Sequence, residues 1–202
     1  LFGIFLMSGL GLSAPSAQAV LLPAKYPRLA NYYLNPSITP NQAVTLAQWD
    51  VVILGAELQY THPEIFPILR QHNPNIILLA YVASEEIPSS YRTIIDPAHP
   101  HAKLVSGVAD GWWFLNTAGQ RESIWPGTQM LNLTDQAPLV NGKRWNTYLP
   151  TFVHENIMST GLWDGIFYDN MFNDISWLNG GNIDLDRNGI AANAVTADSA
   201  WR

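Results

Sequence analysis

Two apolar runs decide the fold class of this chain: Asp50–Leu54 (DVVIL) and Asn75–Val82 (NIILLAYV). Such nearly continuous apolar runs, the first of them rich in β-branched residues, are typical of parallel strands whose two faces are both buried. Working outward, Arg28–Leu34 (RLANYYL) and Leu162–Tyr168 (LWDGIFY) predict a strand before them and a strand after them. The chain should therefore contain four strands of one sheet.

Helical stretches separate these runs. Thr39–Trp49 begins with Thr39 as N-cap and Pro40 at the first helical position, and Pro63–His72 and Arg144–Ser159 follow. Alternating strands and helices predict parallel pairing with right-handed crossovers. An open doubly wound sheet and a (β/α)₈ barrel both fit. No glycine-rich phosphate-binding motif follows any strand, which favours the barrel.

We therefore predict an α/β fold, the N-terminal half of a (β/α)₈ TIM barrel with about four βα units, covering residues 20–202. A long insert follows the third strand, Ser84–Gly142, and contains signals for its own small sheet at Gly111–Asn116, Ile124–Trp125 and Met130–Thr134. Thr196–Arg202 should begin a helix capped by Thr196. Four strands cannot close a barrel, so we expect the chain to be truncated at its C-terminus.

The first residues are typical of a signal peptide. Leu1–Leu12 is an apolar run, and Ala17-Gln18-Ala19 has the A-x-A pattern of a cleavage site. The run is shorter than the roughly 20 apolar residues of a membrane span. We expect a signal peptide over residues 1–19, clipped at its start, cleavage after Ala19, and a secreted, periplasmic or extracellular protein. A buried N-terminal helix is the alternative.

The composition excludes several classes of protein. Of the 202 residues 48% are hydrophobic and 13% charged, which excludes intrinsic disorder. The formal charge of −6 argues against a nucleic-acid partner. The absence of cysteine excludes disulfides, thiolate metal sites and a cysteine nucleophile.

The segment Trp163–Asn170 (WDGIFYDN) carries the strongest functional signal. Asp169 ends a buried strand, and the active sites of barrels lie at such C-terminal strand ends. Glycoside hydrolysis needs two carboxylates beside the scissile bond, and Asp169 suits the one that attacks or stabilises the anomeric centre. Capping of the following turn is the alternative. Asp164 is expected to cap the start of the strand or to accept bonds from backbone amides.

Other strand-end and insert residues could bind a sugar, which needs planar hydrogen-bonding groups and aromatic faces. The predicted substrate-binding residues are Tyr33, Asn35, Glu57, Tyr81, Glu85, Trp113, Trp125, Tyr168 and Asn170. Glu57 is a rival catalytic carboxylate. Glu85 and Glu86 could instead be a solvated loop pair, and the tryptophans could form the core of the insert.

A second motif, Asp184–Gly189 (DLDRNG), resembles the first half of a calcium loop, with Asp184, Asp186 and Asn188 as ligands. It is not an EF-hand, because the twelfth position is Val195. Asp198 is the next carboxylate that could close the shell. A polar turn is the alternative, and beyond this structural Ca²⁺ we expect no cofactor.

Three stretches resemble a known family: W-D-G-I-F-Y-D-N, the preceding L-L-A-Y-V, and W-W-F-L-N-x-x-G-Q in the insert. They resemble bacterial (β/α)₈ proteins known as hypothetical glycosyl hydrolase family 15. The Y-D-N element is also similar to the fourth-strand signature of α-galactosidase-type retaining glycosidases. That resemblance implies that Asp169 is the nucleophile and that the acid/base lies on a later strand, beyond Arg202.

The prediction is a secreted glycoside hydrolase with a carbohydrate substrate and a retaining mechanism. A non-catalytic carbohydrate-binding or envelope-associated barrel is the main alternative. An open α/β domain that binds a small polar ligand is the third.

Overall fold

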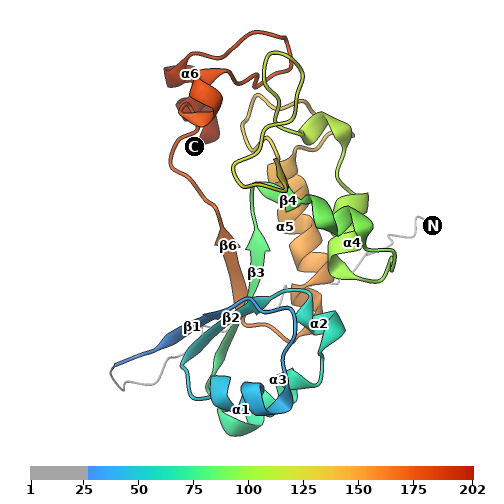
Figure 1. The fold of residues 1–202 in the computed structure, drawn as a ribbon, viewed down its shortest axis with the longest axis vertical. Coiled ribbons are helices and arrows are strands. Elements are labelled where there is room, and N and C mark those ends of the chain that lie inside the picture. The colour runs from blue at the N-terminus through green and yellow to red at the C-terminus, as the bar shows by residue number, and fades with distance from the viewer. Residues whose placement is uncertain (1–26) are drawn as a thin grey trace, which may run out of the picture.

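The computed structural model describes residues 27–202, so the predicted signal peptide, residues 1–19, lies outside the described part of the chain. Its centre is a parallel sheet of four strands in the order β1-β2-β3-β6 (Figure 1). The strands are β1 Ala30–Tyr33, β2 Val51–Gly55, β3 Ile77–Ala83 and β6 Gly165–Asp169. The four predicted strands and their parallel pairing are confirmed.

The register of this sheet gives it two different faces. Val52, Leu54, Leu78 and Ala80 lie on one face and are completely buried in the main core. Because side chains alternate along a strand, the residues between them point to the other face. That second face is called the open face here.

Helices pack against the buried face. They are α1 Pro40–Leu46, α3 Ile65–His72 and α5 Trp145–Asn156, and all three contribute to the main core. Thr39 caps α1 through a capping box with Gln42, as the sequence predicts. However, α1 ends at Leu46 rather than at Trp49, because residues 48 and 49 turn through tighter i−3 bonds toward β2.

The predicted helix at 63–72 is also present, although it contains Pro67. This proline is the third residue of α3, where a backbone N–H has no acceptor within the helix, so no hydrogen bond is lost. A short helix that the sequence analysis missed, α2 Leu58–Thr61, precedes it. The helix predicted over 144–159 becomes α5 and, after Ile157, the 3₁₀ turn η3 Met158–Thr160.

The insert after β3 holds a two-stranded antiparallel sheet, β4 Glu86–Pro88 with β5 Thr128–Met130. The strand predicted at Gly111–Asn116 is wrong: η2 Asp110–Trp112 occupies its start, and the rest makes only isolated bridges. The other elements of the insert are η1 Ser89–Thr93 and α4 Pro100–Ser106.

The segment after β6 builds a second core with the insert (Figure 1). This segment contains η4 Leu178–Gly181 and α6 Ala194–Trp201. The N-cap of α6 is Asn193 and not Thr196: the Asn193 side chain accepts a bond of 3.0 Å from the Thr196 amide. The correction follows from side-chain reach, because a cap accepts from an amide two or three residues further along.

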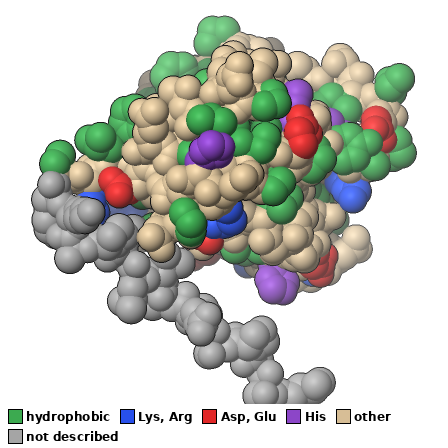
Figure 2. Space-filling model, turned by 90° about the horizontal axis from the view of Figure 1, so that it is seen from below, with side chains coloured by type: hydrophobic (Ala, Val, Ile, Leu, Met, Phe, Trp, Pro, Cys, Tyr) green, Lys and Arg blue, Asp and Glu red, His purple; other side chains and the backbone are tan. Residues whose placement is uncertain are grey.

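No helix in the described range 27–202 is long and apolar enough to cross a membrane. On the face shown in Figure 2, single acidic, basic and histidine side chains are scattered among hydrophobic and uncharged ones. This face therefore presents no concentrated basic surface of the kind that nucleic-acid binding requires.

The capping box of α1 yields a stability prediction. Thr39→Ala removes the acceptor for the Gln42 amide, so we expect the free energy of unfolding to fall by about 1 kcal/mol, measured by urea denaturation. Thr45→Ala in the same helix is the control, because its hydroxyl only bonds the Asn41 carbonyl of its own helix. Equal losses in both variants would contradict the role of the cap.

Candidate functional site

Asp169 is the last residue of β6 and lies on the open face, at the C-terminal edge of the sheet. Its Oδ2 accepts a hydrogen bond of 2.8 Å from the Tyr81 hydroxyl and a longer one of 3.4 Å from Tyr32. Its Oδ1 accepts 2.9 Å from the Asn170 amide. The carboxylate is thus held by neutral donors, and one of its oxygens also accepts from the next backbone amide.

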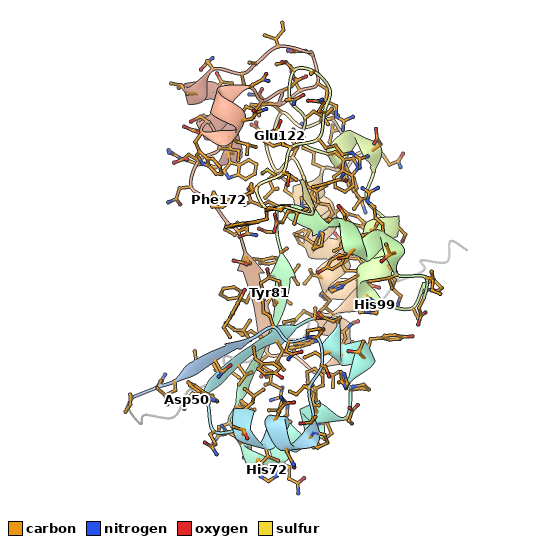
Figure 3. The ribbon with its side chains drawn as sticks, viewed as in Figure 1. Asp50, His72, Tyr81, His99, Glu122 and Phe172 are labelled. Carbon is orange, nitrogen blue, oxygen red and sulfur yellow. The ribbon has the colours of Figure 1, made fainter. Side chains whose placement is uncertain are left out.

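Aromatic rings cover the open face beside this carboxylate. Tyr32 meets the rings of Tyr81 and Phe167 edge to face, with centroids 5.8 and 5.6 Å away, and the last two stack at 6.3 Å. Tyr32 keeps 51% of its surface exposed. Figure 3 shows Tyr81 near the middle of the molecule, on the sheet. An exposed aromatic surface next to a carboxylate matches the needs of a sugar ring.

The tyrosine hydroxyls remain protonated donors. Burial, followed by the hydrogen bond to Asp169 and its charge, raises the pKa of Tyr81. Burial and the same charge raise the pKa of Tyr32. Both hydroxyls therefore stay protonated at neutral pH and donate to Asp169.

Two further carboxyl groups lie behind Asp169. Glu86 is buried, and its oxygens accept hydrogen bonds of 3.0 Å from the Asn170 side-chain amide and 2.9 Å from the Thr128 hydroxyl. Burial is the main cause that raises the pKa of Glu86. The alternative of a solvated pair, Glu85 with Glu86, is therefore wrong: the antiparallel pairing of β4 with β5 encloses them both.

Glu85 is the most unusual group of the site. It has 0% exposure, and neither carboxylate oxygen has a hydrogen-bond partner in the described structure. Burial, then the charges of Glu86 and Asp169, raise its pKa to about 8. Glu85 is therefore mostly neutral at pH 7.

Glu57 follows β2 but has a different partner. Its Oε2 lies 3.5 Å from Nε2 of His101, whose ring stacks on Tyr91 at 3.7 Å. Burial lowers the pKa of His101 to about 3, so the imidazole is neutral and the pair is not a salt bridge at neutral pH. Burial also raises the pKa of Glu57. The charge of Asp169 acts on Glu85 and Glu86, whereas Glu57 lies beside His101.

Three predicted substrate-binding residues lie away from Asp169. Tyr33 and Tyr168 alternate with Tyr32 and Asp169, so they point to the helix-covered face. There the Tyr33 hydroxyl donates to the Ser37 carbonyl, and Tyr168 lines a pocket against α5. The Asn35 side chain accepts from the Ser37 amide and stabilises a turn.

The two tryptophans predicted to bind substrate differ in exposure. Trp113 is buried, and the guanidinium groups of Arg92 and Arg121 lie 4.9 and 4.3 Å from the centre of its ring. It therefore belongs to the main core, with the sheet and its covering helices. Trp125, before Pro126, is 51% exposed and therefore does not belong to that core.

The hydrogen bonds of Asp164 have a structural role. Its Oδ2 accepts 2.8 Å from the Leu78 amide and 3.1 Å from the Arg70 guanidinium. The prediction that Asp164 accepts bonds from backbone amides is confirmed, and this carboxylate joins β3 to the start of β6.

The Asp184–Gly189 motif forms a tight loop. Asp184 accepts from the amides of Asn188 and Gly189 at 3.0 and 2.8 Å, and Asp186 accepts 2.9 Å from the Asn188 side chain. Asp198 caps a different turn, at Ile175 and Ser176. Among the described residues no three acidic, histidine or cysteine side chains are arranged to hold a metal. Calcium binding at Asp184, Asp186 and Asn188 stays a prediction.

Three contributors stand outside the set of predicted substrate-binding residues: Tyr32 and Glu86, which lie at strand ends in the sequence, and Phe167. Phe167 could have been predicted, because side chains two residues apart on a strand point to the same face, and Phe167 precedes Asp169 by two. Tyr32 and Glu86 need the strand register and the β4–β5 pairing, which depend on contacts between distant segments.

A comparison with known protein families identifies the family of this chain. Residues 70–202, which are most of the chain, match the family described as hypothetical glycosyl hydrolase family 15. The chain belongs to this family. No curated protein matches the sequence. The matched range contains Asp169, Glu85 and Glu86, and it confirms the resemblance of the chain to family 15; the further likeness of the Y-D-N stretch to α-galactosidases stays a prediction.

Glu85 makes stability depend on pH. In the unfolded chain Glu85 loses its proton near its ordinary pKa of 4.5, but in the folded protein only near 8. Glu85 therefore lowers the free energy of unfolding by an amount that grows as pH rises from 4.5 to 8 and is constant above pH 8. We expect Glu85→Gln to unfold at higher temperature than the wild type at pH 8, with the difference shrinking toward pH 4.5. Glu155→Gln, at an exposed position, is the control, and a pH-independent difference would contradict the buried neutral acid.

The calcium prediction is tested by thermal denaturation. If the Asp184 loop binds Ca²⁺, millimolar Ca²⁺ should raise the melting temperature, EDTA should reverse the rise, and Asp184→Asn should abolish it. Mg²⁺ at the same concentration controls for ionic strength. An unchanged melting temperature assigns the motif to the turn alone.

Proposed function

We propose that this chain is the N-terminal part of a secreted glycoside hydrolase that acts on O-glycosidic bonds with retention of configuration. Asp169 is the nucleophile, and the acid/base lies on a later strand beyond Arg202. The single observation that carries this proposal is the position of the Asp169 carboxylate. It lies at the C-terminal end of a parallel strand, is held by Tyr81, and faces exposed aromatic rings.

The order of the strands supports a half-barrel. The four strands of the central sheet are neighbours in the order in which they occur along the chain. A doubly wound sheet instead reverses direction at a switch point. In a complete (β/α)₈ barrel the helix-covered face would be the outside, and the open face with Tyr32, Tyr81 and Phe167 would be the inside.

The site suggests how the reaction proceeds. The ionised Asp169 attacks the anomeric carbon while the acid protonates the leaving oxygen, and water then hydrolyses the glycosyl–enzyme ester. The Tyr81 hydroxyl fixes Oδ2, which leaves the carboxylate in one orientation for attack. As the ester forms, Asp169 loses its charge and these hydrogen bonds weaken. They reform when water releases the sugar, so they assist the second step.

A second candidate is a non-catalytic carbohydrate-binding barrel. The exposed Trp125 and Tyr32 favour it, because stacking on a sugar needs no catalytic carboxylate. In that case Asp169 would only accept hydrogen bonds from sugar hydroxyls. A second Asp or Glu that ends the sixth strand of the full-length protein supports the enzyme.

Secretion belongs to the same proposal. It rests on the apolar run and the A-x-A pattern within residues 1–19. The mature protein would begin after Ala19, and its substrate would be a carbohydrate outside the cytoplasm.

The nucleophile is tested in the full-length protein by Asp169→Asn. We expect turnover, measured as reducing ends released in a polysaccharide screen, to fall by at least about 10³-fold, because the neutral amide cannot form the ester. Tyr81→Phe should retain part of the activity. Asp135→Asn, an exposed site with the same charge change, is the control.

The melting temperature of each variant shows whether folding is retained. Turnover at the wild-type level in a folded Asp169→Asn variant removes Asp169 from the nucleophile role. Inversion of the anomeric configuration, followed by NMR of the first product, overturns the retaining mechanism even if Asp169 is essential.

A further inference from the structure

Three carboxyl groups lie close together at the C-terminal edge of the sheet: Glu85, Glu86 and Asp169. Asn170 links two of them, since its amide donates to Asp169 and its side chain donates to Glu86. Glu85 interacts electrostatically with both of these carboxyls. We call this group the acidic cluster.

The acidic cluster has no cationic partner within residues 27–202. Its hydrogen-bond donors are the hydroxyls of Tyr32, Tyr81 and Thr128 and the amide groups of Asn170, all of them neutral. Arg70 pairs with Asp164, and Arg121 and Arg187 pair with Asp110, so these three ion pairs lie outside the cluster.

Glu85 independently indicates that the site lacks a hydrogen-bond donor or a positive charge. Buried polar groups in folded proteins are normally hydrogen-bonded, and a buried carboxyl without a partner is costly. Both oxygens of Glu85 are buried without a hydrogen bond in the described structure, and Glu86 and Asp169 are the charges that act on them. A donor or a positive charge brought by a ligand would remove this penalty.

We propose that the site selects carbohydrates that carry free, protonated amino groups, and that it discriminates against N-acetylated and acidic sugars. The carbohydrate part of this inference rests on the proposed function. The charge preference rests on the acidic cluster and on the unpartnered Glu85. An ammonium group near Asp169 would be attracted by the negative charge of the carboxylates and would donate hydrogen bonds to their oxygens. It would also make cation–π contacts with the ring faces of Tyr32 and Tyr81.

The same arrangement explains the discrimination. N-acetylation removes the charge of the amine, so the sugar loses its attraction to the carboxylates. A uronic acid places a like charge beside Asp169 and Glu86, which is unfavourable in a partly buried site. A neutral hexose would bind through the aromatic rings alone.

The test is calorimetric binding to the full-length protein at pH 6, where the amines are protonated. The probes are a glucosamine tetramer, its fully N-acetylated form, and tetragalacturonate. We expect the free-amine tetramer to bind about tenfold or more tightly than the N-acetylated one, and tetragalacturonate to bind most weakly. Raising the NaCl concentration from 50 to 300 mM should weaken only the binding of the free amine.

Variants separate the acidic cluster from the overall charge of the protein. Glu86→Gln should reduce the preference for the free amine over the N-acetylated tetramer to about threefold or less. Glu155→Gln changes the net charge equally at an exposed position on α5 and should leave the preference intact. The melting temperature shows that each variant is folded.

The outcomes are distinct from those of the nucleophile test. Equal affinities, tighter binding of the acetylated or acidic probe, or no binding of the free amine overturns the inference. Hydrolysis of a neutral glycan by Asp169 without an amine preference leaves the proposed function in place and removes this inference. A preference for the free amine without any turnover leaves this inference in place and removes the proposed glycosidase activity.

Discussion

The hydrogen bond between the Tyr81 hydroxyl and Asp169 Oδ2 connects the chemistry of the site to the architecture of the sheet. It exists only because β3 and β6 pair in parallel with Ala83 opposite Asp169, which places Tyr81 two residues back on the same face. Asp164 reinforces this pairing from the other end of β6, where it bonds the Leu78 amide and Arg70. A shift of one residue would turn Asp169 toward the helices and Tyr168 toward the open face.

The charge balance of the site has an energetic consequence. Glu85 and Glu86 are buried close to Asp169, and the raised pKa of each shows that the folded state disfavours their ionised forms. A protein selected for stability alone would place neutral side chains there. Groups that destabilise the fold in this way are typical of functional sites, where a ligand supplies the missing partner.

Much of the fold could be predicted from local patterns. The apolar runs gave the four strands, and Thr39 with Pro40 gave the start of α1, because these signals depend only on neighbouring residues. Predictions failed where contacts decide the structure. The residues around Trp113 resemble a strand, but they form η2 and isolated bridges, and Trp113 is buried in the main core. The alternative of Glu85 and Glu86 as a solvated pair failed in the same way.

The sequence by itself determined that the chain has parallel strands alternating with helices and that a carboxylate ends the last of these strands. Periodicity and capping are local properties, so they can be recognised without a structure. Only the tertiary structure decided which side chains join Asp169: Tyr32, Tyr81, Phe167 and Glu86 rather than Tyr33, Asn35 and Tyr168. The reason is that strand register and the burial of the insert depend on packing between segments far apart in the chain. A shift of one residue in the register reverses the face on which a side chain lies.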